Sequence, residues 1–145
     1  MTVDVNTEVV IDRAPADVAA FACDPDNAPK WYVNIASVEW KTPAPLRVGT
    51  RVAFVAHFLG RRLAYTYEVS ELVPGQRLVM QTSEGPFPME TTYTWSAQGA
   101  GTRMTLRNRG VPSGFSKVVA PFMAGSMRRA NERDLARLKA ILEAT

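Results

Sequence analysis

Polar side chains recur on the inward face of a long series of predicted strands. Between Leu63 and Val69 apolar and polar residues alternate at period two, which places Tyr65 and Tyr67 on one face of a strand. The same face of the later strands is predicted to carry Thr82, Thr91, Tyr93 and Asn108. A buried hydroxyl without a partner costs about 1 to 3 kcal/mol, so hydroxyls gathered on one face need each other, water or a ligand. We therefore expect an internal cavity with aromatic walls and a few polar points, the usual composition of a small-molecule site.

Large apolar side chains of the strands, the second helix and the last helix are predicted to line the same cavity. They are Trp31, Phe54, Phe58, Met80, Met89, Trp95, Phe122 and Met123. Any one of them would also be an ordinary core residue of a sheet packed on a helix. The cluster carries the prediction, because three tyrosines, two threonines and an asparagine on one face exceed what a dry core readily satisfies.

Two segments near the expected mouth of the cavity contain glycine and proline beside a phenylalanine. The segment "EGPFPM" holds Phe87 and "RGVPSGF" holds Phe115, and such loops can move as lids over a site. Trp31 and its neighbour Tyr32 are further candidates to cover this mouth. Two plain turns, each with one buried ring, explain the same pattern equally well.

The residue types argue against a catalytic triad and against a metal site. His57 is the only histidine and falls on the outward face with Arg51, which leaves a serine or cysteine triad without a base. Cys23, the only cysteine, lies in the apolar run "DVAAFAC" and is predicted to be a small core residue. One cysteine and one histidine cannot supply the ligands of a zinc site, and no Gly-rich phosphate loop precedes a helix. We expect no metal and no cofactor.

Two carboxylates are candidates for acid/base work, although no catalytic residue is assigned. Asp134 falls within the apolar stripe of the last helix, where burial would raise its pKa. A place at the edge of the stripe, paired with a neighbouring arginine, is the simpler interpretation. Glu90 points outward by parity, unless a bulge after Pro88 reverses the strand.

The elements that must position these side chains follow from the periodicity. "VDVNTEVVI" alternates as a strand, and "PADVAAFAC" indicates a helix with proline in its first turn. Asp24 is predicted to cap a short second helix, which Pro29 limits to a turn or two. Period two then returns for about seventy residues, broken by the turn signals at Gly60, "VPGQ", "EGPFP" and "QGAGT".

The last segment changes to helical spacing. One stripe is formed by Val119, Met123, Met127, Ala130, Leu138 and Ile141. A helix of ~27 residues would be about 40 Å long, so it must lie across something as large as a domain. On another side Arg129, Arg133 and Arg137 repeat at i, i+4. A nucleic-acid or membrane surface could use this stripe, but a solvated outer face is the simpler interpretation.

Length and composition limit the class of protein. The 145 residues carry a net charge of +3 and are predicted to form one domain, 1–145, which is large enough for a core without disulfides. No stretch approaches the ~20 apolar residues of a membrane span, and the alternating N-terminal residues lack the pattern of a secretory signal. With a single cysteine as well, the expected location is the cytoplasm.

One strand, two short helices, six strands and a long C-terminal helix predict an α+β fold, in which a curved seven-stranded antiparallel sheet wraps around the long helix. This order, with "PADVAAF", "DPDNAPKW", "VPGQRL" and "MRRANERDLARLK", resembles the START-like helix-grip superfamily (Bet v 1-like, SRPBCC). Within it, the chain is most similar to the bacterial polyketide cyclase/dehydrase and lipid-transport branch. The resemblance covers essentially the whole chain and implies a hydrophobic cavity between the sheet and the long helix. These segments specify the fold, not an activity.

Three functions remain open at this point. The preferred one is binding of a small hydrophobic or aromatic ligand, lipid-like or polyketide-like, by a non-catalytic carrier, sensor or sequestering protein. The resemblance also implies a cyclase or dehydratase that folds a flexible substrate in the same cavity, since positioning alone supplies a large share of a barrier. The third is a protein-interaction module that uses the basic helix face or a sheet edge. Neither nucleic acid nor stable membrane insertion is expected.

Overall fold

The computed structural model describes residues 3–58, 60–84, 88–110 and 120–145. In chain order its elements are β1 (Val3–Ile11), α1 (Pro15–Cys23), the 3-10 helix η1 (Pro25–Asn27), α2 (Ala28–Trp31), β2 (Ile35–Trp40), β3 (Arg51–Phe58), β4 (Arg61–Val73), β5 (Arg77–Glu84), β6 (Met89–Gln98), β7 (Gly101–Gly110) and α3 (Ala120–Glu143). This is the order that the periodicity predicts.

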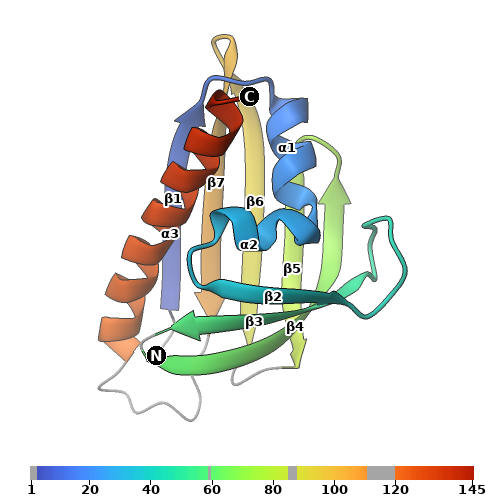
Figure 1. Cartoon of the computed structure of the whole chain (residues 1–145), viewed down its shortest axis with the longest axis vertical. Coiled ribbons are helices and arrows are strands. Elements are labelled where there is room, and N and C mark those ends of the chain that lie inside the picture. The colour runs from blue at the N-terminus through green and yellow to red at the C-terminus, as the bar shows by residue number, and fades with distance from the viewer. Residues whose placement is uncertain (1–2, 59, 85–87, 111–119) are drawn as a thin grey trace.

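The seven strands form one antiparallel sheet in the order β1-β7-β6-β5-β4-β3-β2. The sheet is strongly curved: β2 and β3 cross in front of the lower parts of β6 and β7 in Figure 1, and β4 bends between the two directions. The pairing of β4 with β5 shifts register between Thr66 and Tyr67 and again between Val69 and Glu71. Such irregularities increase local twist and bend the strand, so they account for the curl. The predicted helix-grip architecture is confirmed.

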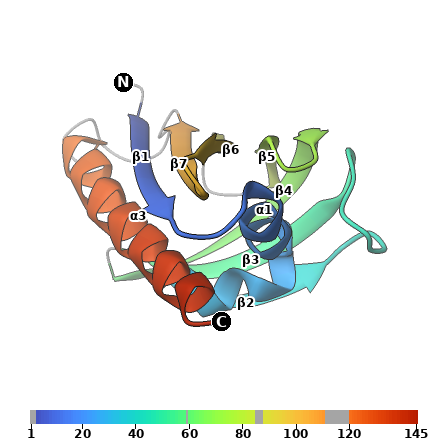
Figure 2. The same cartoon turned by 90° about the horizontal axis from the view of Figure 1, so that it is seen from above.

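All three α-helices lie on the concave side of this sheet (Figure 2). Helix α3 packs against β1, α1 contacts β6 and β7, and α2 contacts both α3 and β2. Helices α2 and α3, which contact each other, therefore cover the concave face together. In the described part of the chain, none of the helices combines the length and the apolar character that a membrane span requires.

The short helices end where the sequence signals predict. Pro15 is the first residue of α1, a position where its missing N–H costs nothing. The Asp24 carboxylate accepts a hydrogen bond from the backbone N–H of Asp26 at 3.0 Å and so caps η1, as expected. Helix α2 has only four residues and ends at Trp31, with Tyr32 directly after it. The aromatic side chains at its end consequently face the interior of the molecule.

The main core cluster lies between the sheet and the C-terminal half of α3. Its fully buried members include Ile11 of β1, Trp31 of α2, Met104 and Leu106 of β7, and Leu135 and Leu138 of α3. The outer face of the sheet instead carries cross-strand ion pairs such as Arg107 to Asp4, with about half of each side chain exposed. Exposed pairs of this kind contribute about 0 to 1 kcal/mol each. Stability therefore rests on the inner face, and His57 points away from it, as parity predicts.

Candidate functional site

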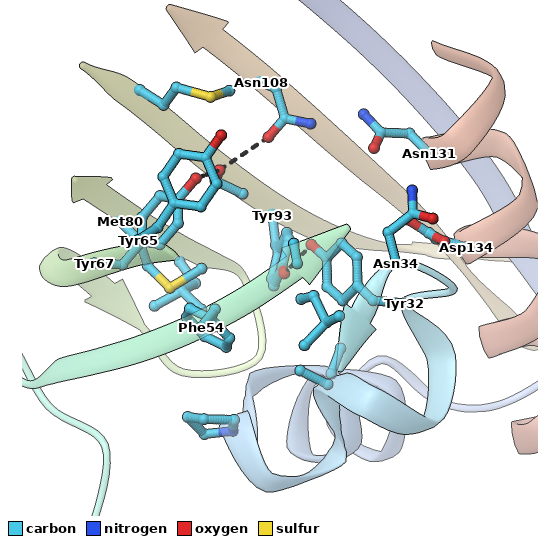
Figure 3. A pocket seen from close by; sticks show the side chains of 18 of the residues that line it. Tyr32, Asn34, Phe54, Tyr65, Tyr67, Met80, Tyr93, Asn108, Asn131 and Asp134 are labelled. Carbon is cyan, nitrogen blue, oxygen red and sulfur yellow. Dashed lines mark hydrogen bonds between the residues drawn. The ribbon is translucent and has the colours of Figure 1, made fainter. Parts of the chain in front are cut away.

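A cavity of about 150 Å³ lies between the concave face of the sheet and helices α2 and α3 (Figure 3). Its walls are formed by side chains from both sides of the gap. Of the residues predicted to contact a ligand, those that line it are Phe54, Tyr65, Tyr67, Met80, Met89, Thr91, Tyr93 and Asn108. The structure brings these positions together from β3, β4, β5, β6 and β7.

Strand register explains how residues far apart in the sequence meet at this wall. Thr91 of β6 is paired with Met80 of β5 on one side and with Asn108 of β7 on the other. On the curled part of the sheet, Phe54 of β3 is paired with Tyr65 of β4. Because directly paired residues point to the same face, one row of side chains crosses the sheet and faces the helices.

The wall formed by β3, β4 and β5 is aromatic and apolar. The rings of Phe54 and Tyr67 meet edge to face, with centroids 5.8 Å apart at 72°. The centroids of Tyr65 and Tyr67 are 6.0 Å apart. Edge-to-face and tilted pairs at this spacing are the favourable arrangements for aromatic rings. Together with Met80, these rings make one side of the cavity a surface suited to an apolar or aromatic guest.

A small polar group interrupts this wall where β6 and β7 meet. The Thr91 hydroxyl donates to Asn108 Oδ1 at 2.9 Å and lies 3.5 Å from the Tyr67 hydroxyl. Burial raises the pKa of Tyr67, and the hydrogen bond with Thr91 opposes that rise. The hydroxyl of Tyr67 therefore stays neutral at any physiological pH. The group is largely satisfied by itself, which leaves it as a positioning feature of the wall.

Two tyrosines meet across the middle of the cavity. The hydroxyls of Tyr32, which follows α2, and Tyr93 of β6 are hydrogen-bonded to each other. The ring of Trp31 contacts that of Tyr32 in a tilted arrangement, with centroids 4.1 Å apart. Burial raises the pKa of both tyrosines, and their mutual proximity adds to the effect on Tyr32. The pair links α2 to the sheet and closes the cavity between them.

Asp134 places a carboxylate at the α3 side of the cavity. Only 2% of the residue is exposed, and its Oδ1 accepts a hydrogen bond from the Val33 backbone N–H at 2.9 Å. Burial raises the pKa of Asp134 from 3.8 to about 6, although the Val33 hydrogen bond and the charges of Arg133 and Arg137 act against the rise. Asp134 is thus an acid that changes charge close to neutral pH.

This finding corrects one interpretation of the sequence. The prediction that Asp134 lies at the edge of the helical stripe and pairs with an arginine is wrong, because the residue is buried and lines the cavity. Arg133 and Arg137 are exposed, and in the described part of the chain neither forms an ion pair with Asp134. Glu90 lies on the outer face as parity predicts, where it accepts a hydrogen bond from Gln81 Nε2 at 3.3 Å.

The polar groups of the cavity gather at one end. Figure 3 shows Asn34, Asn131 and Asp134 on the side of α3, with Phe54, Tyr65, Tyr67 and Met80 opposite and the Tyr32–Tyr93 pair between them. Asn131 is 4% exposed, and its Nδ2 has no hydrogen-bond partner among the described residues. The cavity therefore has an apolar end and a polar end whose hydrogen-bonding capacity is not fully used.

A second hollow, of about 700 Å³, lies on the other side of α1. It runs between α1, Trp40 and the segments that contain Pro45 and Pro74. Cys23, Pro25 and Leu46 contribute to the walls of both hollows. These side chains stand between the two spaces. The thiol of Cys23 is unreactive there, because burial raises its pKa to about 12.

Four predicted residues lie in the described part of the chain but do not line the cavity: Trp31, Thr82, Trp95 and Met123. Trp31 and Trp95 are buried in the main core cluster, and the indole nitrogen of each has no partner among the described residues. Met123 packs with Val3, Val5 and Met89 near the other end of the sheet. Thr82 accepts a hydrogen bond from the Met89 backbone N–H at 2.9 Å and so ties the end of β5 to β6.

The remaining predicted residues cannot be placed. Phe87 and Phe115, with the two lid segments that contain them, lie outside the described residues. The backbones of Phe58 and Phe122 belong to β3 and α3, but their side chains are also outside the described part of the structure.

Several lining residues are absent from the set of predicted contacts. Asn131 and Asp134 are three residues apart on α3, and the sequence does contain their signal, since they interrupt the stripe of Met127, Ala130 and Leu138. Tyr32 carries a weaker signal, as a neighbour of Trp31 in a helix too short to show periodicity. Asn34 and Leu46 lie in connecting segments, where no periodic pattern indicates a direction.

The curled sheet, the long helix across it and the cavity between them define the class of protein: a helix-grip fold of the START/Bet v 1-like (SRPBCC) superfamily. More particularly, the chain belongs to the polyketide cyclase/dehydrase and lipid transport family, whose model matches residues 2–143. None of the curated proteins matches the chain.

Solved structures share the fold at low identity. A protein from Thermus thermophilus is 24% identical, with a TM-score of 0.84 over 98% of this chain and 99% of its own. The Zhui aromatase/cyclase from Streptomyces sp. R1128 is 14% identical, with a TM-score of 0.83 over 99% and 94%. A START superfamily protein from Mycobacterium smegmatis is also 14% identical, with a TM-score of 0.82 over 97% of both chains. At these identities the likeness extends to the fold alone.

Proposed function

We propose that this protein binds a small hydrophobic or aromatic molecule in the cavity between the sheet and α3, as a carrier, sensor or sequestering protein. The observation that carries the proposal is the composition of the cavity wall. Aromatic and apolar side chains form most of it, and a few polar groups converge at one end. Small-molecule sites have this composition, because the apolar area supplies affinity and the few polar groups fix orientation.

The comparisons support the same proposal. The family description names lipid transport beside polyketide cyclisation and dehydration, and a lipid is a largely apolar molecule. Within the described residues the polar groups on the β-sheet wall already bond to one another, as Thr91 does to Asn108. A ligand therefore does not have to supply hydrogen-bond partners for Thr91 and Asn108. A cytoplasmic location and the absence of a cofactor stay predictions.

Equilibrium dialysis against a mixed panel of fatty acids, sterols, flavonoids and small aromatic compounds tests the proposal, with mass spectrometry of what the protein retains. We expect at least one compound to be retained with its mass unchanged. If the protein retains nothing and alters nothing across the panel, ligand binding is the wrong function for this cavity.

A second candidate is a cyclase or dehydratase that uses the same cavity. It is favoured by Asp134, because a buried carboxyl with a pKa of about 6 is suited to exchange a proton with a bound substrate near neutral pH. The aromatase/cyclase among the structural neighbours has the same fold. In the dialysis experiment an enzyme would release a product lighter by one water, and Asp134→Asn would abolish that product while the substrate still bound.

A further inference from the structure

The dimensions and the polarity of the cavity restrict which small molecule it accepts. We infer that the ligand is a compact, single-ring aromatic molecule whose hydroxyl group donates to Asp134 and accepts from Asn131. This inference rests on the proposed function, since it names the ligand class of the same site. It is carried by the cavity volume, by the unused hydrogen-bonding groups on α3 and by the separation of the cavity into two ends.

The volume sets the size of the ligand. An apolar protein cavity of about 150 Å³ holds one benzene molecule, whereas sites for drug-sized ligands have about 300 to 1,000 Å³. The cavity here has about 150 Å³. A fatty acid, a sterol or a multi-ring polyketide is larger than this volume, so part of it would have to lie outside the cavity or displace wall residues. Cys23, Pro25 and Leu46, which separate this cavity from the second hollow, are the residues in the way.

The polar end sets the functional group of the ligand. The Val33 N–H donates a hydrogen bond to Asp134 Oδ1. Among the described residues no hydrogen bond is formed by Oδ2, so Oδ2 can accept one from a ligand. Asn131 Nδ2 is buried without a partner among the described residues. A buried N–H group normally donates a hydrogen bond, so a ligand that supplies an acceptor here would be favoured. One hydroxyl group can form both hydrogen bonds, because it donates to Asp134 Oδ2 while its oxygen accepts from Asn131 Nδ2.

The spacing of the two residues allows a single hydroxyl to meet both. Asn131 and Asp134 are three residues apart on α3, and side chains at that separation lie about 5 to 6 Å apart on one helix face. Both side chains point from α3 toward the cavity (Figure 3). The ring of the ligand then extends from the polar end toward the Tyr32–Tyr93 pair in the middle of the cavity, and the aromatic wall of Tyr65, Tyr67 and Phe54 lies beyond it.

The experiment is a set of titrations of the whole protein with phenol, toluene and 2-naphthol, followed by amide resonances in NMR spectra. Toluene has the shape of phenol with a methyl group in place of the hydroxyl, and 2-naphthol adds one ring. The Val33 amide is a local reporter, because it is bonded to Asp134. We expect phenol to bind about tenfold to a hundredfold more tightly than toluene, as a hydrogen bond to a charged group implies. We also expect 2-naphthol to bind more weakly than phenol.

A variant assigns this preference to Asn131. Asn131→Leu keeps the size of the side chain and removes its hydrogen bonds, so the ratio of phenol to toluene affinity should fall at least fivefold while toluene still binds. Retained toluene binding shows that the variant is folded. Glu132→Ala, at an exposed position on the same helix, is the matched control and should leave the ratio unchanged.

The outcomes separate this inference from the proposed function. If toluene binds as tightly as phenol, or if 2-naphthol or a fatty acid binds more tightly than any single-ring compound, the inference is overturned while ligand binding stands. The inference is also overturned if Asn131→Leu retains the full preference for phenol. If no compound of any size is bound, the proposed function fails as well.

Discussion

The backbone N–H of Val33 donates to Asp134 Oδ1 at 2.9 Å, which joins the segment after α2 to the middle of α3. The hydrogen bond holds a buried carboxyl at the cavity wall and gives it a partner on one oxygen only. A single backbone donor offsets part of the cost of burial, which is why the pKa of Asp134 remains raised. This contact at the cavity wall is therefore also sensitive to pH.

Asp134 should make the free energy of unfolding depend on pH. Its pKa is raised from 3.8 to about 6 in the folded protein, so the folded state holds the proton to higher pH than the unfolded chain. Stability is then lost as pH rises from about 4 to about 6 and stays reduced above that, by on the order of 3 kcal/mol.

Urea unfolding of the wild type and Asp134→Asn, at about pH 4 and about pH 8, measures this effect. The advantage of the variant over the wild type should grow between the two pH values by roughly the amount that the shift implies. Glu132→Gln, at an exposed position on α3, serves as the control and should show no such growth. An advantage that is the same at both pH values would contradict the account.

The hydrogen bond between the hydroxyls of Tyr32 and Tyr93 should appear as coupling between the two residues. Tyr32→Phe or Tyr93→Phe alone leaves the other hydroxyl buried without this partner, at a cost of about 1 to 3 kcal/mol each. In the double variant both hydroxyls are gone, so its loss of stability should be smaller than the sum of the single losses. Chemical denaturation of the four proteins measures the cycle, and strictly additive losses would show that the pair does not interact.

Leu46 should limit the size of the ligand. It contributes to the walls of both hollows, so Leu46→Ala would join the two spaces. We expect the variant to gain affinity for two-ring compounds relative to single-ring ones, when both are titrated under the same conditions. Val48→Ala, at a more exposed position in the same segment, should not change the ratio. An unchanged ratio in Leu46→Ala would mean that Leu46 does not separate the hollows.

Gly101 should be the least replaceable glycine among those described. A Cβ at this position would lie 2.5 Å from the backbone oxygen of Ile11, so Gly101→Ala must push β7 away from the end of β1. Gly125 of α3 offers the contrast, because the nearest atom there is the end of the Arg129 side chain at 3.6 Å. Gly125→Ala should stabilise by about 0.5 to 1 kcal/mol, as alanine does inside a helix. Thermal unfolding would show a loss for the first variant and a gain for the second. Equal behaviour would contradict the close approach of β1 and β7.

The sequence predicts the fold well because the strands and the long helix each have a clear period. The alternation of apolar and polar residues indicates which side chains of a strand point inward. Tyr65, Tyr67 and Tyr93 are therefore correctly assigned to the concave side of the sheet. The alternation does not indicate which helix covers a given position on the concave face. Trp95 is inward as predicted, yet it lies two residues beyond Tyr93 and is covered by the core around α1 rather than by the cavity.

The polar end of the site is harder to predict, because it depends on packing between elements. Asn131 and Asp134 are visible in the sequence as polar interruptions of an apolar stripe. Whether such residues are buried or lie at an edge is decided by the position of α2, which brings Val33 to Asp134. The pairing of Tyr32 with Tyr93 depends on the same placement, and four residues of helix show no periodicity from which to derive it.

If the ligand binds inside this cavity, a side chain that fills the cavity should prevent binding. Ala130 is buried on α3 and lines the space, so Ala130→Phe places a ring where the ligand would lie. The measurement is equilibrium dialysis of the wild type and the variant against the same panel, with circular dichroism to show that both are folded. The account predicts that the wild type retains a compound and that the folded variant loses it. Equal retention by both proteins would place the ligand elsewhere and contradict the account.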